Sequence, residues 1–167
     1  MKKNTIIYTM LLEEPIEGFW CYTIDTEGNV YSYKRQKYLK PILDNNGYYV
    51  VHLLNGSISK RVTIHKLVAN AFIPNSLNKP EVDHKDNNML NNSISNLRWA
   101  TRSEQCANQK RKGSNLKGVQ QQGEKFRANI RINGKNTYLG MFKTEEEAHK
   151  AYCKKAKEVF GDFFNTG

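Results

Sequence analysis

The chain has 167 residues, close to the size of one ordinary domain, and its 26 Lys and Arg residues against 16 Asp and Glu give a net charge of +10. No stretch approaches the roughly 18 apolar residues of a membrane-spanning helix, so we expect a soluble intracellular protein with no membrane partner. The basic charge favours an anionic partner, and by itself it suits DNA, RNA or an anionic membrane equally. Any separate functional regions must be small modules.

Three cysteines occur, at positions Cys21, Cys106 and Cys153. Their number is odd, they are widely spaced, and they form no Cys-x-x-Cys pair. Neither a zinc site nor a disulfide framework is therefore indicated, and we expect no bound zinc.

Residues 1–75 are expected to form a β-rich N-terminal module. Two short runs rich in aromatic and β-branched residues, 22–24 and 30–32, flank a turn containing Gly28 and predict a hairpin. A further strand is predicted over 47–54. The next periodic segment, 64–72, has the pattern of an amphipathic helix that ends before a proline.

The adjacent residues Asp83 and His84 are the first candidates for chemistry. Hydrolysis of a phosphodiester needs a base to activate water and a cation to stabilise the leaving oxygen. An imidazole with a pKa near ~6.5 is largely neutral at cellular pH and suits the base. A carboxylate is a hard oxygen ligand suited to magnesium. Because successive residues of an extended segment point to opposite faces, the two side chains would take different roles.

The Asn-rich run from Asn87 to Asn92 follows this pair and is interpreted as a solvated loop without chemistry. A short strand is predicted after it, in which Leu97 and Trp99 face inward. The same alternation leaves Arg98 on the other side of the strand.

A short helix is expected directly after this strand. Thr101–Glu104 has the spacing of a capping box, so the helix should begin just after Thr101. Gln105 would lie in its first turn, where its amide oxygen could reach a cation held by Asp83. Asn108 lies three positions further along, on the same helix face.

The joint pattern of Asp-His at 83–84, Asn-Leu-Arg-Trp at 96–99 and a capped helix resembles an HNH nuclease. In that family the fold is a two-stranded hairpin and a helix around one metal ion, called ββα-metal, and residues 76–109 would form it here. The first 75 residues are similar to the N-terminal module that accompanies many HNH homing-type endonucleases, including its His-Lys-Leu-Val-Ala-x-Ala-Phe helix.

The resemblance implies a role for each polar residue of this segment. His84 would be the general base, and Asn96 would brace the loop and the imidazole. Asp83 and Gln105 would ligate one magnesium or manganese ion per active site. Because such nucleases usually carry His or Asn where this chain has Gln105, Asn108 is the alternative ligand.

A polar, basic linker is predicted over 110–116. Its cations Lys110, Arg111 and Lys112 lie next to one another. They could follow the DNA backbone between a cutting and a reading module, a hypothesis that rests on their charge alone.

Beyond the linker, residues 125–133 alternate completely between apolar and polar side chains, as a half-buried strand does. Asn133-Gly134 predicts a two-residue hairpin turn into the next strand. A second capping box is predicted from Thr144 and Glu147. Apolar residues then recur at helical spacing as far as a predicted C-cap at Gly161.

Residues 117–167 resemble the Apetala-type, or ethylene-response-factor, DNA-binding domain through their Lys-Gly-Val start, Leu-Gly-x-Phe strand and Ala-x-x-Ala-Tyr helix. A three-stranded antiparallel sheet packed on one helix is expected, with a cationic open face that fits a major groove. The resemblance implies that strand residues read DNA bases. The side chains predicted to contact DNA are Lys117, Lys125, Arg127, Asn129, Arg131 and Lys135.

We therefore predict an α+β protein built from small modules, with an HNH core and a DNA-reading sheet. It should act as an HNH homing-type endonuclease on double-stranded DNA, nicking one strand to leave 5′-phosphate and 3′-hydroxyl ends. A monomer is favoured, in the cytoplasm or nucleus of a host cell or in a phage- or virus-infected cell. Two alternatives are a sequence-specific DNA-binding regulator with a disabled HNH core and an RNA-binding protein without catalysis.

Overall fold

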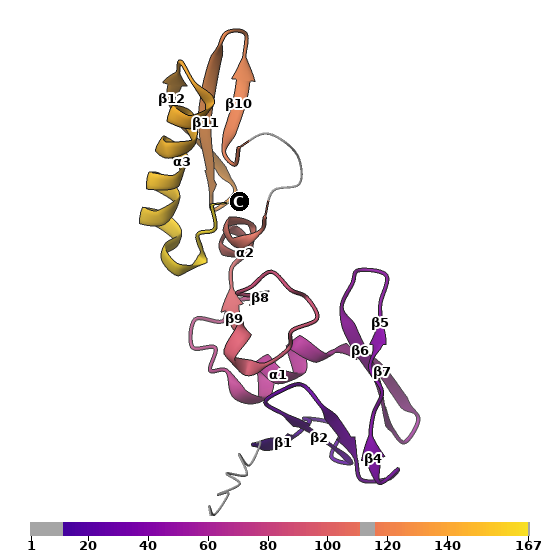
Figure 1. The fold of residues 1–167 in the computed structure, drawn as a ribbon. Helices are drawn as coiled ribbons and strands as arrows, with labels where there is room; N and C mark the ends of the chain where they lie inside the picture. The colour runs from indigo at the N-terminus through magenta and orange to yellow at the C-terminus, as the bar shows by residue number, and fades with distance from the viewer. Residues whose placement is uncertain (1–11, 111–115, 167) are drawn as a thin grey trace, which may run out of the picture. The chain divides into compact units, whose positions relative to one another are not determined.

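The computed structural model describes residues 12–110 and 116–166, which fall into two compact units. The first comprises Met1–Pro74 and Met89–Leu97, and the second Asn75–Asn88 and Arg98–Gly167. Each unit combines short strands with helices, in agreement with the predicted mixture (Figure 1). Within the described ranges, no helix has both the length and the apolar character needed to cross a membrane.

The first unit contains two small antiparallel sheets, with strand orders β1-β2-β3-β4 and β5-β6-β7. The strands are β1 (Glu13–Pro15), β2 (Tyr22–Asp25), β3 (Val30–Ser32), β4 (Lys37–Tyr38), β5 (Ile42–Leu43), β6 (Tyr49–Asn55) and β7 (Ile58–Thr63). The predicted first hairpin is confirmed, since Tyr22 pairs with Ser32. The strand predicted over 47–54 corresponds to β6.

The turn between β2 and β3 explains why a glycine stands there. The carboxylate of Asp25 accepts hydrogen bonds from the backbone N–H groups of Glu27 and Asn29, at 2.9 and 2.8 Å, which closes the turn. Gly28 has a φ of +88°, and a Cβ at this position would lie only 2.7 Å from Cγ2 of Ile64. A larger residue would therefore both strain the turn and push away the helix that begins at Ile64.

Helix α1 (Ile64–Phe72) spans the predicted range and packs on the sheets of the first unit. Its buried face includes Leu67 and Val68, which share the apolar interior with Ile24 and Leu53 of the strands. The short 3-10 helix η1 (Ile94–Asn96) also contacts α1. Burial of this one apolar stripe is what stabilises a helix of only nine residues.

The second unit contains the Asp-His pair. Strands β8 (Glu81–His84) and β9 (Leu97–Ala100) form a two-stranded sheet, and helix α2 (Arg102–Asn108) follows β9. The predicted capping box is present: Thr101 Oγ1 accepts from the Glu104 N–H at 3.3 Å, and Glu104 Oε2 accepts from the Thr101 N–H at 2.7 Å. These two bonds satisfy donors at the start of α2 and fix where the helix begins.

The rest of the second unit is a three-stranded antiparallel sheet with one helix along one face (Figure 1). The elements are β10 (Val119–Gln122), β11 (Lys125–Ile132), β12 (Lys135–Phe142), α3 (Glu145–Phe160) and the 3-10 helix η2 (Gly161–Phe163). The predicted hairpin turn is confirmed, because Asn133 and Gly134 have φ values of +48° and +81°, as a type I′ turn requires.

Helix α3 differs from the prediction at its start. Thr144 Oγ1 accepts from the Glu147 N–H at 3.2 Å, as expected. The Glu147 carboxylate, however, accepts from the N–H of Lys143 and not from that of Thr144, so the cap is not reciprocal. The helix ends as predicted, with Gly161 at a φ of +51°.

One apolar cluster joins α2 to the sheet and to α3, and its buried members are Ala107, Ile130, Tyr152, Ala156 and Phe160. Burial raises the pKa of Tyr152 to about 12. Gly118 is required beside this ring, since a Cβ there would overlap it. Helix α2 is therefore packed directly on the C-terminal sheet and helix, in addition to being connected to them through residues 110–116.

Candidate active site

Asp83 and His84 lie at the end of β8 and are both buried, with 4% and 6% of their surfaces exposed. A carboxylate and an imidazole are costly to bury unless hydrogen-bonding or charged partners surround them. The partners of these two residues therefore decide what the site can do.

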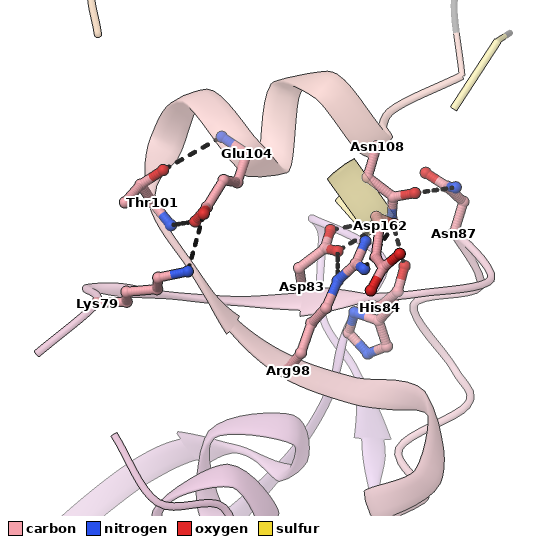
Figure 2. Close-up of polar contacts among 9 residues, drawn as sticks. All are labelled: Lys79, Asp83, His84, Asn87, Arg98, Thr101, Glu104, Asn108 and Asp162. Carbon is pink, nitrogen blue, oxygen red and sulfur yellow. Dashed lines mark hydrogen bonds and ion pairs between the residues drawn. The ribbon is translucent and has the colours of Figure 1, made fainter. Parts of the chain in front are cut away.

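Two side chains hold the Asp83 carboxylate (Figure 2). Asn108 Nδ2 donates to both oxygens at 3.1 Å, and Arg98 Nε donates to Oδ2 at 2.8 Å. The ion pair is shielded from water, because the side chains of Arg98 and Asp83 are only 17% and 5% exposed. Each carboxylate oxygen has two acceptor positions, so Oδ1 keeps one for a further ligand.

Asn108 connects the site beyond Asp83 as well. Its Nδ2 also donates to the backbone oxygen of His84 at 2.8 Å, and its Oδ1 accepts from Asn87 Nδ2 at 3.3 Å (Figure 2). Asn108 is 3% exposed. The last residue of α2 thereby joins β8 to the loop that follows it.

The structure brings Asn108, and not Gln105, to the Asp83 carboxylate. The side-chain oxygen of Gln105 accepts from Arg102 at 3.0 Å on the exposed side of α2. Gln105 lies nearly one turn before Asn108, which ends the helix beside β8. Of the two carboxamides that the sequence offers, Asn108 is the one in contact with the carboxylate.

The Asn-rich run is partly buried, contrary to the prediction of a merely solvated loop. Asn92 is 6% exposed, and Asn87 contacts Asn108. In the first unit, Asn96 Nδ2 donates to the backbone oxygen of Asn91 at 2.8 Å, which braces the loop. The prediction failed because asparagines that look solvated in a sequence can be the buried partners of backbone groups.

Arg98 is a site residue that sequence reasoning missed. Besides binding Asp83, it donates through Nη1 to the backbone oxygen of Asp162 at 2.9 Å. Its guanidinium carbon lies 3.7 Å from the centre of the Phe163 ring. These partners are 15 and 64 positions away in the chain, so no local pattern could have indicated them.

A second ion pair anchors the start of α2. Lys79 Nζ donates to Glu104 Oε1 at 2.8 Å, while the other oxygen of Glu104 completes the capping box (Figure 2). Burial alone would raise the pKa of the Glu104 carboxyl, but the bonds from Lys79 and Thr101 outweigh it and hold this pKa below its usual value. The pair ties α2 to the segment that leads into β8.

The sheet face opposite α3 carries the side chains predicted to read DNA. Ala128 and Ile130 are buried on the α3 side, so their neighbours Arg127, Asn129 and Arg131 point the other way. Arg127 Nε donates to Asn129 Oδ1 at 3.1 Å. The strand thus presents two guanidinium groups and an amide on one surface.

The remaining predicted DNA contacts divide into two groups. Lys110, Lys125 and Lys135 are exposed. Arg111 and Lys112 lie outside the described residues. The predicted linker can therefore be placed only at its ends.

Lys117 has a different use from the one predicted. Its Nζ donates to the backbone oxygens of Ala107, Gln109 and Asn165, at 2.6, 2.8 and 3.2 Å. Burial lowers the pKa of this ammonium group. All three of its donors are engaged within the protein: two bind carbonyls at the end of α2, and the third binds the carbonyl of Asn165. The structure thus gives the ammonium group of Lys117 three partners within the protein in place of the predicted DNA phosphate.

Two family models match the chain. A model described as HNH endonuclease matches residues 62–107, which include Asp83, His84 and nearly all of α2. A model of the NUMOD4 motif matches residues 14–53 in the first unit.

Similar proteins come from a virus and a phage. One HNH endonuclease of Acanthamoeba polyphaga mimivirus is 44% identical over 87 residues, 52% of this chain but 26% of that relative. The DNA endonuclease I-HmuI of Bacillus phage SP01 is 38% identical over 101 residues, 60% of this chain and 58% of that one. This chain thus spans about a quarter and about three fifths of the lengths of these two relatives.

A solved structure of I-HmuI, described as DNA binding and cleavage by the HNH homing endonuclease, matches with a TM-score of 0.52 and 36% identity, over 55% of this chain and 53% of that one. Another mimivirus HNH endonuclease is 33% identical over 161 residues, which is 96% of this chain and 80% of that protein. Because this last alignment spans nearly the whole chain and most of the relative, the chain belongs to the HNH endonuclease family.

Proposed function

We propose that this chain is a homing-type endonuclease that hydrolyses phosphodiester bonds of double-stranded DNA and nicks one strand at a time. The observation that carries the proposal is the buried Asp83-His84 pair, held by Asn108 within the HNH segment. One such pair per chain supports nicking over a double-strand break by a single copy.

HNH nucleases generally use a divalent metal ion. Asp83 offers it one oxygen, because Oδ1 retains an acceptor position after its bond from Asn108. Among the described residues no cluster of three or more His, Cys, Asp or Glu side chains could hold an ion by itself, so waters and phosphate would supply the remaining ligands. We propose magnesium or manganese, one ion per site, since these ions accept one or two protein oxygens and keep several waters. When bound, the ion would supply positive charge that stabilises the transition state and the departing 3′ oxygen.

Asn108 is the stronger candidate for a second ligand, ahead of Gln105, because it already contacts Asp83. Rotation of its amide group would present an oxygen toward an ion at Asp83, in exchange for the bonds that its nitrogen donates to Asp83 and to the backbone of His84. Gln105 would first have to leave Arg102. The nicking rates of Asn108→Ala and Gln105→Ala distinguish the two assignments.

His84 acts as the general base in this proposal. Its neutral imidazole takes a proton from water as the water oxygen attacks phosphorus, and the bond from phosphorus to the 3′ oxygen breaks. The 3′ oxygen then gains a proton from solvent, which leaves 5′-phosphate and 3′-hydroxyl ends. The bond from Asn108 to the backbone oxygen of His84 ties the end of β8 to α2, and the bond from Asn96 to the backbone of Asn91 braces the loop.

We assign the ββα-metal core to residues 76–109, with β8, β9 and α2 as its two strands and helix. Residues 1–75 form the nuclease-associated module, and 110–116 the linker. Residues 117–167 are proposed to be an Apetala-type DNA-binding domain. Its support is a three-stranded antiparallel sheet that has α3 on one face and basic side chains on the other.

The DNA-reading surface in this proposal is the open face of that sheet. Arginine suits the acceptor edge of guanine, and asparagine the edge of adenine, while lysines contact phosphates. The residues assigned to this surface are Lys125, Arg127, Asn129 and Arg131. Lys135 pairs with Ile132, which packs on the α3 side, so we assign it a phosphate contact outside this face. Lys110, with Arg111 and Lys112, would follow the backbone outside the bases.

The test is nicking of supercoiled plasmid in magnesium by wild type, His84→Ala and His52→Ala at equal protein concentration. His52 is exposed on β6, so its variant controls for the substitution itself. We expect nicking by wild type and His52→Ala and its loss in His84→Ala, with DNA binding in EDTA unchanged in all three.

Two results would contradict the proposal. Nicking by His84→Ala at the wild-type rate would remove His84 as the base. Binding of DNA without nicking by any variant, in magnesium or manganese, would favour the DNA-binding regulator with a disabled core.

A further inference from the structure

The short turn η2 lies against the nuclease core of the second unit. The backbone oxygen of Asp162 accepts from Arg98 Nη1 at 2.9 Å, and the Phe163 ring lies 3.7 Å from the guanidinium carbon of Arg98. The ammonium group of Lys79 lies 5.0 Å from the centre of the same ring. A single aromatic side chain therefore contacts two cations of the core.

Both cations on this ring are members of the ion pairs that shape the site. Arg98 binds the Asp83 carboxylate, and Lys79 binds Glu104 in the cap of α2 (Figure 2). The planar guanidinium can stack on the ring and donate in its own plane to Asp83 at the same time. The ring thus restricts the orientation of the group that holds the carboxylate.

The residues after η2 are attached to the core as well. The N–H of Asn165 donates to the backbone oxygen of Ala107 at 3.2 Å, and Lys117 Nζ binds the backbone oxygen of Asn165. We call residues 161–165 the strap. It is fixed at both of its ends, to Arg98 on β9 and to the last turn of α2.

We propose that Phe163 is a positioning residue for the metal ligand Asp83, acting through Arg98. With the ring in place, Arg98 keeps its Nε on Oδ2, so that Oδ1 is the oxygen left for a cation. Without the ring, the long Arg98 side chain gains rotamers that leave Asp83, and the carboxylate loses its fixed orientation. The inference rests on the proposed function, because it takes Asp83 as the metal ligand.

The test is the affinity for manganese, measured by titration calorimetry on the whole chain without DNA. Phe163→Leu keeps an apolar side chain but removes the ring, whereas Phe163→Tyr keeps the ring. Phe164→Leu is the matched control, because Phe164 packs on the same apolar cluster as Phe163, whereas the contacts of Arg98 and Lys79 are with the Phe163 ring. We expect Phe163→Leu to weaken manganese binding about fivefold, with Phe163→Tyr and Phe164→Leu within about twofold of wild type.

The same shift should appear in the magnesium concentration for half-maximal nicking, with DNA affinity in EDTA unchanged. Arg98→Lys, which keeps the charge but cannot stack and donate in one plane, should reproduce the loss and decides the matter if Phe163→Leu does not fold. Equal effects of Phe163→Leu and Phe164→Leu, or no effect of Phe163→Leu and Arg98→Lys, would overturn the proposal. Asp83→Ala separates this failure from failure of the proposed function, since manganese binding that survives Asp83→Ala would refute the metal site itself.

Discussion

The side-chain nitrogen of Asn108 lies 3.1 Å from both carboxylate oxygens of Asp83, although the two residues are 25 positions apart. The contact joins the end of α2 to the end of β8, and both residues are buried. It places a carboxamide beside the candidate metal ligand, and it gives α2 a specific part in the site.

This contact predicts that Asn108 matters more than Gln105. Groups that orient a metal ligand typically change metal affinity or activity by about 10- to 100-fold when they are removed. We expect Asn108→Ala to lower the initial rate of plasmid nicking by about that factor, and Gln105→Ala to change it by less than about threefold, because Gln105 faces Arg102. The measurement is the nicking rate across a magnesium titration.

The two variants control for each other, since each removes a carboxamide from α2. A large loss in Gln105→Ala with little change in Asn108→Ala would restore Gln105 as the ligand predicted from the sequence. Circular dichroism of both variants would check that α2 and the rest of the fold remain.

The ion pair of Lys79 and Glu104 predicts a pH dependence of stability. The pKa of Glu104 is lowered in the folded state from its usual 4.5, so its charge stabilises the protein fully above that pH, and the stabilisation is lost as the pH falls through the folded pKa. Glu104→Gln keeps an acceptor for the capping box but loses the charge. We expect this variant to be less stable by about 1 kcal/mol near neutral pH, with the difference shrinking below pH 4.5.

Thermal unfolding measured from neutral pH down to about pH 3 would follow this difference. Glu124→Gln makes the same change at an exposed position and should leave the melting temperature unchanged across the range. A Glu104→Gln difference that stays constant, or grows as the pH falls, would contradict the assigned pKa direction.

Lys117 should contribute to stability and not to DNA affinity. Its ammonium group donates to three backbone oxygens, and loss of hydrogen bonds made by a charged group typically costs about 2 kcal/mol. We expect Lys117→Met to lower the free energy of unfolding by about that amount, as measured by urea denaturation. Lys150→Met, at an exposed position of α3, should have little effect.

We expect the side chains on the open face of the sheet to provide most of the affinity for DNA. Replacing Arg127 and Arg131 together by Ala should weaken binding at least about tenfold at moderate salt, and should make the dependence of log affinity on log salt shallower by about 1 to 2. Lys150 and Lys154 lie exposed on α3 and provide a control, because replacing both by Ala removes the same charge from the helix. Equal losses in the two double variants would mean that net charge, and not this face, governs binding.

Much of the fold could be predicted from local sequence patterns. The capping box at Thr101 and Glu104, the hairpin turn at Asn133 and Gly134 and the helix over 64–72 could all be predicted, because each depends on residues a few positions apart. Local spacing also governs side-chain alternation, which is why the polar face of β11 was found correctly.

The sequence by itself determined that an Asp-His pair stands in an HNH segment, and it named both candidate carboxamides. Only the tertiary structure shows that Asn108, and not Gln105, contacts Asp83. It also pairs Arg98 with Asp83 and directs the Lys117 ammonium group to backbone oxygens of the protein. The physical reason is distance along the chain. These contacts join residues from β8, α2 and the strap, and their partners are selected by packing and by the need of buried polar groups for hydrogen bonds, neither of which leaves a short-range pattern.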